Sequence, residues 1–207
     1  MTSATETSPD WAFVVSELIQ ARQTVLPKRL VEPGPDAGQT QAILAAAAAA
    51  PDHLQLLPWR FILVPAGQRA TLAEVFARAL SERDPQATPE QLAQAREKAF
   101  RAPLLMLAVV DGARGDPEVD LNERILSAGC AVQNMLLMAT AMGYGSALTS
   151  GKALGSQALR QRFHLSAGEQ ALCFLSVGTV AARRPARTRP TVADYCSTLG
   201  PAPIPTQ

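Results

Sequence analysis

Histidine and cysteine are scarce in this chain, which limits the chemistry its side chains can perform. Only two histidines occur among 207 residues, His53 and His164, and they lie far apart in the sequence. No cysteine or carboxylate stands at the short spacings that zinc sites use. A serine hydrolase elbow, Gly-x-Ser-x-Gly, is also missing. The sequence therefore gives no support for a zinc centre or for a Ser-His-Asp triad.

Charge and length narrow the class of protein further. Lys and Arg number 19 and Asp and Glu 18, a formal net charge of +1, so no overall field draws the molecule onto nucleic acid or an anionic membrane. A chain that is 47% hydrophobic can bury one core, or serve as a subunit that a partner completes. We expect residues 11–182 to form one domain, between a flexible N-terminus, residues 1–10, and a tail, residues 183–207.

Cysteine usage and the terminal segment indicate the compartment. Cys130, Cys173 and Cys196 are an odd number at wide spacing, which suits reduced thiols better than a disulfide framework. The first ten residues are polar and lack the pattern of a signal peptide. No apolar run reaches the roughly 18 residues of a membrane span. We therefore expect a soluble cytoplasmic protein.

Helical signals dominate the first half of the chain. Ser8 is expected to cap a first helix, with Pro9 and Asp10 in its first turn, and apolar residues then recur at helical spacing over 11–19. The helix through the alanine run should stop near Pro51. A helix over 121–142 is apolar around much of its circumference, so it should lie at the centre of the molecule or of a dimer. Further helices are expected over 68–81, from Thr88 and Pro89 onward, and over 156–163, and Gly143 should end the 121–142 helix.

Three apolar runs are too short for helices and predict strands. Residues 60–64 are rich in apolar and β-branched side chains, and the last strand is expected within 171–180. Residues 104–110 are continuously apolar, which indicates a strand covered on both faces. The Arg- and Pro-rich tail cannot form a regular helix and should run over a surface. Together these elements predict an α+β domain with several long helices around a mixed central sheet.

The segment GSALTSGKA, residues 145–153, has some likeness to a phosphate-binding P-loop. That motif needs Gly, four residues, and then Gly-Lys-Ser/Thr. Ser146 stands where the first glycine should be, and Ala153 stands where the magnesium-binding hydroxyl should be. Nucleoside triphosphate hydrolysis is therefore disfavoured. We expect a loop whose backbone N–H groups can approach a flat or anionic ligand.

The polar residues that remain suit anion binding better than proton transfer, because they can make charge-assisted hydrogen bonds. They are Arg22, Thr24, Lys28, Arg29, His53 and Gln55, with an arginine cluster at residues 183–189. A plainer alternative is that the arginines are solvated surface and that His53 stands at a helix terminus, where the macrodipole favours it. The residues by themselves leave both interpretations open.

Five segments in a fixed order resemble the nitroreductase family, and within it the compact YdjA-like branch. They are ARQTVLPKRLVEPGP, APDHLQLLPWRF, RAPLLMLAVV, SAGCAVQNMLLMATAMGYGSALTSG and FLSVGTV, spread over residues 19–180. The resemblance implies a nitroreductase-like fold and an intertwined homodimer with one FMN in each of two interfacial sites. It also implies an oxidoreductase fed by NADH or NADPH, with hydride chemistry at flavin N5 and no catalytic side chain.

The end of the first helix carries the first part of the implied site. The family has an Arg-Arg-Ser/Thr triplet where this chain has Arg22, Gln23 and Thr24, so Arg22 and Thr24 are expected to bind the FMN phosphate or ribityl chain. Gln23 can still form hydrogen bonds, but it lacks the charge of the second arginine. That loss would weaken flavin affinity or shift the phosphate onto Lys28 or the tail arginines. Lys28 and Arg29 are both candidates to stabilise the reduced flavin at its N1/O2 edge.

The corner after the alanine run carries the second part of the implied flavin site. His53 and Gln55 fall where the family has a Pro-Ser loop and a polar residue near the flavin, so the resemblance places them at the cofactor of the partner subunit. Pro58 and Trp59 match the family's Pro-Trp and are expected to pack beneath that loop.

Two later segments carry the third part of the implied flavin site. Leu148, Thr149 and Ser150 align with a Trp-Arg-Ser triplet of the YdjA-like branch. The serine matches, and the loss of tryptophan and arginine opens or neutralises that side of the pocket. Arg187 and Arg189 stand where other branches place basic residues on the phosphate.

Three functions remain open at this point. The leading one is an FMN-dependent oxidoreductase that acts on nitroaromatics, quinones or related small electron-poor compounds. The second is a flavin-binding protein with a storage or regulatory function and little turnover, which Gln23 and the triplet 148–150 favour. The third is an interaction protein without a cofactor.

Overall fold

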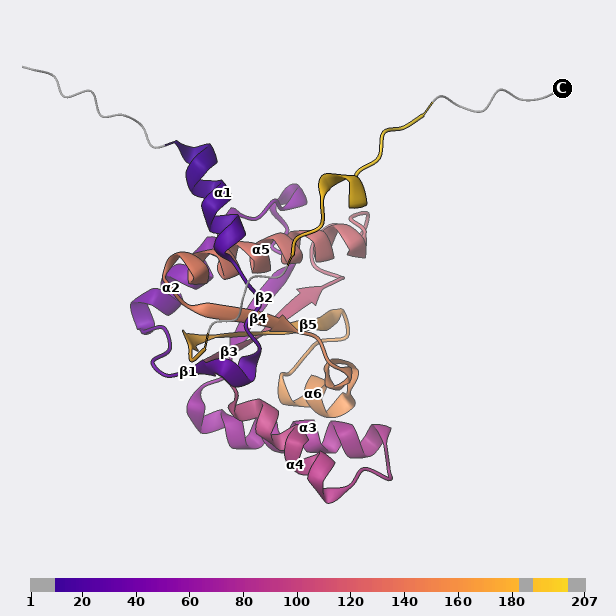
Figure 1. Ribbon diagram of the computed structural model, residues 1–207. Helices are drawn as coiled ribbons and strands as arrows, with labels where there is room; N and C mark the ends of the chain where they lie inside the picture. The colour runs from indigo at the N-terminus through magenta and orange to yellow at the C-terminus, as the bar shows by residue number, and fades with distance from the viewer. Residues whose placement is uncertain (1–9, 183–187, 201–207) are drawn as a thin grey trace, which may run out of the picture.

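The computed structural model describes residues 10–182 and 188–200. In this part of the chain a five-stranded sheet lies between two layers of helices (Figure 1). The helices are α1 (Trp11–Ala21), α2 (Ala37–Ala46), α3 (Arg69–Arg83), α4 (Pro89–Glu97), α5 (Leu121–Ala141) and α6 (Gln157–Arg162). The strands are β1 (Leu30–Val31), β2 (Trp59–Leu63), β3 (Leu104–Asp111), β4 (Gly145–Thr149) and β5 (Glu169–Val180). The expected α+β class is confirmed.

The sheet has the strand order β1-β5-β3-β2, and β4 pairs with β5 off this path. All of these pairings are antiparallel, with Leu104 opposite Val177 and Trp59 opposite Val110. Within the described residues, parallel pairing is limited to an isolated bridge between Thr24 and Ser146. The expectation of a mixed sheet is therefore wrong for the named strands, because a sheet covered on both faces does not require parallel strands.

β3 runs through the middle of the core and is buried along nearly its whole length. Met106 faces the layer of α2 and α5, where it packs in one cluster with Ile43 and Met135. Leu107 faces the layer of α3 and α6, where it packs with Leu72. Successive side chains of a strand point to opposite faces, so this run of apolar residues fills both halves of the core. The predicted covering of residues 104–110 on both faces is confirmed.

Capping residues set several helix ends. Thr88 accepts a hydrogen bond from the backbone N–H of Gln91 in a capping box, with Pro89 at the first position of α4, as expected. Gly143 has a φ of 84° just after α5, which confirms its left-handed cap. The start of α1 differs from the prediction. Asp10 is its N-cap and accepts from the backbone N–H of Phe13 at 3.1 Å, while Ser8 and Pro9 lie outside the described residues.

Residues 145–149 form strand β4, so the prediction of a loop there is wrong. The strand comes very close to its neighbours at Gly145. A Cβ atom at that position would lie 2.5 Å from Cγ2 of Val180 and 2.9 Å from Cδ2 of Leu30. Glycine permits this close packing, and pairing with β5 then supplies the hydrogen bonds of the strand. The two-residue strand β1 was also not predicted.

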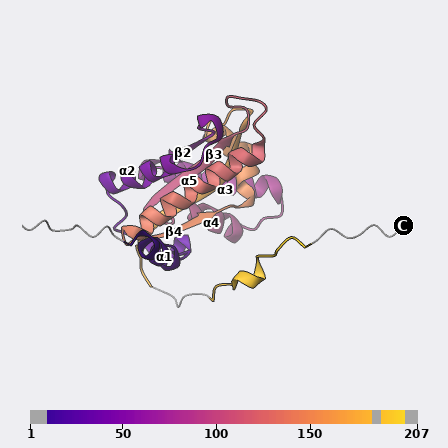
Figure 2. The same ribbon diagram turned by 90° about the horizontal axis from the view of Figure 1, so that it is seen from above.

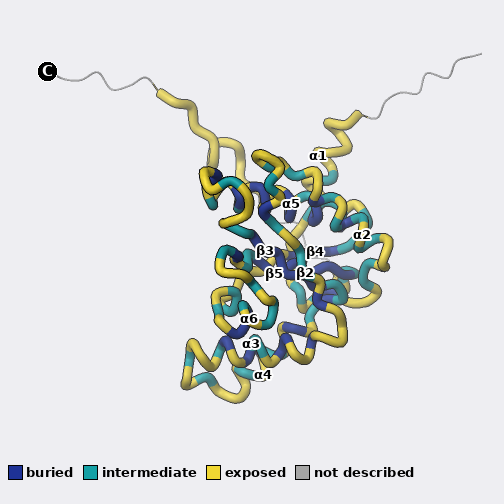
Figure 3. Tube along the Cα trace, turned by 180° about the vertical axis from the view of Figure 1, so that it is seen from behind, coloured by how far each residue is buried: buried dark blue, intermediate teal, exposed yellow. Residues whose placement is uncertain are grey.

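The α1 helix and the tail are much more exposed than the sheet, as Figure 3 shows by colour. No residue of α1 is buried, and Trp11 is 65% exposed. Viewed from above, α1 lies beside one end of α5 and the described tail extends away from the helical layers (Figure 2). Within residues 10–182 and 188–200, none of the helices has the length and apolar character needed to cross a membrane.

Candidate functional site

Arg22 and Arg189 meet at the C-terminal end of α1, although 167 positions separate them. The guanidinium of Arg189 donates to the backbone carbonyl of Arg22 at 2.9 Å. Burial, and secondarily the charge of Arg189, lower the pKa of Arg22 below its ordinary value. Neither side chain has an ion-pair partner among the described residues. Two neighbouring cations with no carboxylate between them form a place where an anion would be stabilised.

The backbone after Arg22 is attached directly to β4. Thr24 forms the parallel bridge with Ser146, and the N–H of Val25 donates to the carbonyl of Ser146 at 3.0 Å. This brings the triplet Arg22-Gln23-Thr24 beside the strand that leads to residues 148–150. The side chains of Gln23 and Thr24 are exposed. The hydroxyl of Ser146 is buried and has no hydrogen-bond partner among the described residues, a rare condition for a buried polar atom.

Leu148, Thr149 and Ser150 lie at the far end of β4 and are all exposed. Leu148 is 48% exposed, which is high for an apolar side chain in a strand. The structure therefore places the triplet on an open surface of the sheet, on the strand that Thr24 contacts.

Lys28 and Arg29 belong to a short 3-10 turn, Pro27–Arg29, that follows the triplet. Lys28 is exposed and Arg29 is half-buried. The carbonyl of Arg29 accepts from the N–H of Ala181 at 3.1 Å, which ties the turn to the end of β5. Arg187 lies outside the described residues.

The corner at residues 52–57 has an unusual backbone. Leu54, Gln55 and Leu57 have φ values of 57°, 53° and 48°, a region that costs energy for residues other than glycine. The carboxylate of Asp52 holds the corner by accepting from the backbone N–H of Leu57 at 2.7 Å. Strained backbone that is held in place in this way concentrates at functional sites.

His53 contacts the start of α5. Its Nδ1 lies 2.7 Å from Oε2 of Glu123, and both side chains are exposed, at 59% and 48%. Just after the corner, Pro58 is buried and Nε1 of Trp59 donates to the hydroxyl of Ser127 at 3.0 Å. The expected packing role of Pro58 and Trp59 agrees with these contacts. The helix of the alanine run ends at Ala46, with a 3-10 turn to Ala49, and His53 lies beyond it in a separate 3-10 turn, at the N-terminal end of α5. A helix N-terminus does not favour a cation, so the macrodipole alternative does not explain the position of His53.

Sequence reasoning missed the residues that support the corner. Arg124 is 1% exposed and its guanidinium donates to backbone carbonyls of the loop before α5, including those of Val119 at 3.0 Å and Asp116 at 2.6 Å. Arg114 of that loop donates to the carbonyl of Leu56 at 2.9 Å. The available signal was the pair Glu123-Arg124, the two charged residues of α5, which stand together in its first turn.

One chain does not bring the predicted residues into a single site. His53 lies at the first turn of α5, whereas Ser146 and Thr24 lie beyond its C-terminal end. A helix of 21 residues is about 30 Å long at 1.5 Å per residue. The structure thus forms two groups, one around Arg22, Arg189 and β4, and one at the corner.

The comparisons with known proteins match this architecture. The model of the nitroreductase family matches residues 20–179. YdjA of Escherichia coli K12, which is provisionally named an NAD(P)H nitroreductase, is 35% identical over 151 residues, covering 73% of this chain and 81% of YdjA. A Haemophilus influenzae protein with the same provisional name is 34% identical, covering 73% of this chain and 82% of its own length. The chain therefore belongs to the nitroreductase family, which confirms the resemblance and the enzyme class, a nitroreductase-like flavin oxidoreductase.

Solved structures share the fold at low sequence identity. A nitroreductase-like family protein from Bacillus cereus superposes with a TM-score of 0.75 at 17% identity, covering 96% of this chain and 99% of that one. A provisionally named nitroreductase from Desulfovibrio desulfuricans, solved in complex with FMN, gives a TM-score of 0.68 at 22% identity, covering 94% and 100% of the two chains.

Proposed function

We propose that this protein is an FMN-dependent oxidoreductase that uses NADH or NADPH to reduce nitroaromatics, quinones or related small electron-poor compounds. The observation that carries the proposal is the Arg22–Arg189 pair, two cations without a carboxylate partner in the described residues, close in the chain to Thr24, which bridges to Ser146 of β4. The Desulfovibrio relative was crystallised in complex with FMN. The relatives from Escherichia coli and Haemophilus influenzae are named as NAD(P)H nitroreductases.

The residues present fit such a cofactor. Arg22 and Arg189 would hold its phosphate through charge-assisted bonds, with Lys28 as a further exposed cation nearby in the chain. Thr24 offers an exposed hydroxyl, and Ser146 carries a buried hydroxyl without a partner among the described residues. Bound FMN would supply the electron-transfer chemistry, and the side chains would bind and orient it. This arrangement suits a site in which the described residues include no nucleophile–base pair.

The apolar surface of one chain supports a homodimer. Trp11 and Phe13 on α1 are 65% and 64% exposed, and Leu126 on the outer side of α5 is 69% exposed. These residues lie on neighbouring helices, since α1 contacts α5. Exposed large apolar side chains on both helices are typical of an interaction surface, and a second copy is the commonest partner of a soluble chain. A two-fold arrangement would also let the corner of one chain, with His53 and Gln55, approach the Arg22 group of the other.

Replacement of Arg22 tests the phosphate site. Arg22→Ala should weaken FMN binding roughly 10- to 150-fold, because a hydrogen bond to a charged group contributes about 1.5–3 kcal/mol. Arg83→Ala is the matched control, an exposed arginine at the end of α3, and should leave the affinity unchanged. The measurement is a fluorescence titration of apoprotein with FMN. Equal affinities for both variants would mean that the phosphate binds elsewhere.

A second candidate is a flavin-binding protein with a storage or regulatory function and little turnover. Two observations favour it: Gln23 is exposed and uncharged where the family triplet has arginine, and Leu148 and Thr149 leave the end of β4 open. Anaerobic stopped flow separates the two candidates. An oxidoreductase should bleach the flavin absorbance within seconds of mixing with NADH or NADPH, whereas a storage protein should not.

A further inference from the structure

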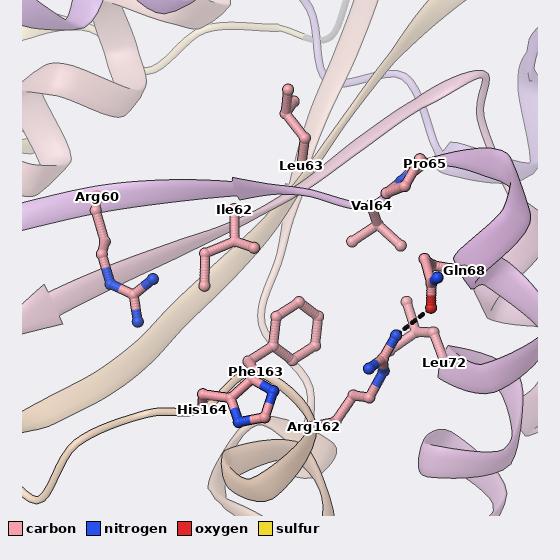
Figure 4. A pocket seen from close by; sticks show the side chains of 10 residues that line it. All are labelled: Arg60, Ile62, Leu63, Val64, Pro65, Gln68, Leu72, Arg162, Phe163 and His164. Carbon is pink, nitrogen blue, oxygen red and sulfur yellow. Dashed lines mark hydrogen bonds between the residues drawn. The ribbon is translucent and has the colours of Figure 1, made fainter.

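A cavity of about 360 Å³ lies on the other side of the sheet, away from the Arg22 group. It is lined by the second half of β2, the start of α3 and the turn after α6 (Figure 4). Arg60, Ile62 and Val64 extend from one face of β2 toward this space, while Leu63 points to the opposite side (Figure 4). Its volume falls within the range of small-molecule sites.

The cavity combines apolar walls with cationic side chains. Ile62, Leu72 and Phe163 supply apolar surface. Arg162 is held by one hydrogen bond to Oε1 of Gln68 (Figure 4), and within the described residues it has no carboxylate partner. His164 is exposed beside it.

The charged side chains around the cavity leave about one positive charge without a carboxylate. A ligand with a single negative charge would balance it. Arg60 is neutralised by a bidentate pair with Glu169, at 2.5 Å and 3.0 Å, and Asp111 also faces it. Arg160, on the neighbouring turn of α6, donates to backbone carbonyls of the α6–β5 turn. Among the described arginines that line the cavity, Arg162 is thus the one without a carboxylate partner, and a guanidinium matches the planar, two-oxygen geometry of a carboxylate.

His164 occupies a position where glycine would be more stable. It follows α6 with a φ of 50°, and the N–H of Leu165 donates to the carbonyl of Arg160 at 3.0 Å, as in a glycine-type helix end. A histidine in this left-handed conformation is strained. Strain of this kind points to a role for the side chain outside the fold itself.

We propose that this cavity binds a small monocarboxylate with an apolar body, whose carboxylate pairs with Arg162 and His164 and whose body contacts Ile62, Leu72 and Phe163. The site is separate from the proposed flavin site. Its existence does not depend on the proposed oxidoreductase activity.

The test uses octanoate, a probe of about ten non-hydrogen atoms that suits a cavity of this size. Binding to the full chain, with any flavin it carries, is measured by isothermal titration calorimetry for the wild type, Arg162→Met, His164→Gly and Arg78→Met. Arg78 is an exposed arginine of α3 that is paired with Glu82 and does not line the cavity. Octan-1-ol serves as the uncharged analogue, and the flavin absorbance is recorded throughout.

We expect saturable binding of octanoate to the wild type. Arg162→Met should weaken this binding about tenfold or more, because it removes a charge-assisted pair. Arg78→Met should remain within about twofold of the wild type, and octan-1-ol should bind more weakly than octanoate. His164→Gly should bind octanoate more weakly without a lower melting temperature, because glycine relieves the positive φ. The proposal is overturned by the absence of saturable binding, by equal binding to Arg162→Met, or by octanoate that displaces or perturbs the flavin.

Discussion

The two helical layers of this molecule differ in how completely one chain fills them. The layer of α3, α4 and α6 packs mainly through contacts within the chain, with buried alanines on α3 and an ion pair between Arg96 and Glu74 that joins α4 to α3; the cavity beside β2 and the exposed Phe100 are its open parts. The layer of α1, α5 and the tail leaves apolar side chains in solvent, among them Trp11, Leu126 and Tyr195. The difference suggests that the first layer stabilises the fold and that the second is built for a partner and a cofactor.

Arg69 shows what a self-contained layer requires. It is 6% exposed, and its guanidinium donates to the carbonyls of Val64, Ala99 and Pro103 at 2.9, 2.9 and 3.0 Å. The end of β2, the turn after α4 and the start of β3 are thereby joined. Arg22, in contrast, is half-buried and keeps its guanidinium unpaired within the described residues.

The largest expected effect is on stability. Arg69→Met removes three hydrogen bonds and leaves two buried carbonyls and one partly buried carbonyl without this donor, so it should lower the free energy of unfolding by about 3–5 kcal/mol. Urea denaturation followed by circular dichroism measures the loss. Arg78→Met, on the exposed side of the same helix, should cost less than about 1 kcal/mol. Similar losses for both variants would contradict the structural role of Arg69.

The next prediction concerns assembly. Leu126→Arg places a charge on the exposed side of α5 and should weaken dimerisation by about 2–3 kcal/mol, roughly 30- to 150-fold in the dissociation constant. Phe100→Arg is the matched control, because Phe100 is also largely exposed, at 58%, but lies next to α4 in the opposite layer. Sedimentation equilibrium reports both constants. If Phe100→Arg dissociated the dimer and Leu126→Arg did not, the interface would have to lie on the layer of α3, α4 and α6.

A smaller effect should appear in acid. The hydrogen bond from Arg60, above all, lowers the pKa of Glu169 below its ordinary value. A carboxylate with a lowered pKa contributes stability above its unfolded pKa, about 4.3, and loses that contribution as the pH falls through the folded value. Glu169→Gln should therefore cost about 1–2 kcal/mol at pH 7, and this deficit should shrink as the pH falls from about 5 to about 3. Urea melts across this range measure it, and a deficit that is constant with pH would contradict the assignment.

The smallest effect is expected for His53. Its pair with Glu123 is exposed, so His53→Ala should change the free energy of unfolding by only about 0.2–1 kcal/mol. If the corner reaches the flavin of the other subunit, FMN affinity should also fall, by about 0.5–1.5 kcal/mol. Glu123→Ala removes the same ion pair but keeps His53. It therefore separates the effect of the pair on stability from the effect of His53 on FMN affinity. If FMN affinity and the flavin spectrum are identical in the wild type and His53→Ala, His53 does not belong to the flavin site.

Local patterns predicted the parts of the fold that depend on near neighbours. The Thr88 cap, the glycine after α5 and the apolar run of β3 each involve a few consecutive residues, and each was confirmed. Strand β4 was missed because GSALT has weak strand propensity, and it becomes a strand only through its pairing with β5 and its close packing at Gly145.

The candidate site could be predicted only in part, because its contacts are long-range. The triplet at Arg22 was found by resemblance, but its contact with Arg189 and its bridge to Ser146 join segments more than 100 residues apart. His53 was singled out, whereas its partner Glu123 was not. No periodicity encodes such contacts, since they arise only when the sheet has assembled.

The most direct test of the whole account is sedimentation velocity of the purified protein, recorded at both 280 nm and a flavin wavelength near 450 nm. We predict one boundary at twice the 21.9 kDa chain mass, with absorbance at both wavelengths and one flavin per chain. A colourless protein that takes up no added FMN, or flavin absorbance that sediments with a single chain, would contradict a flavin site completed by two subunits.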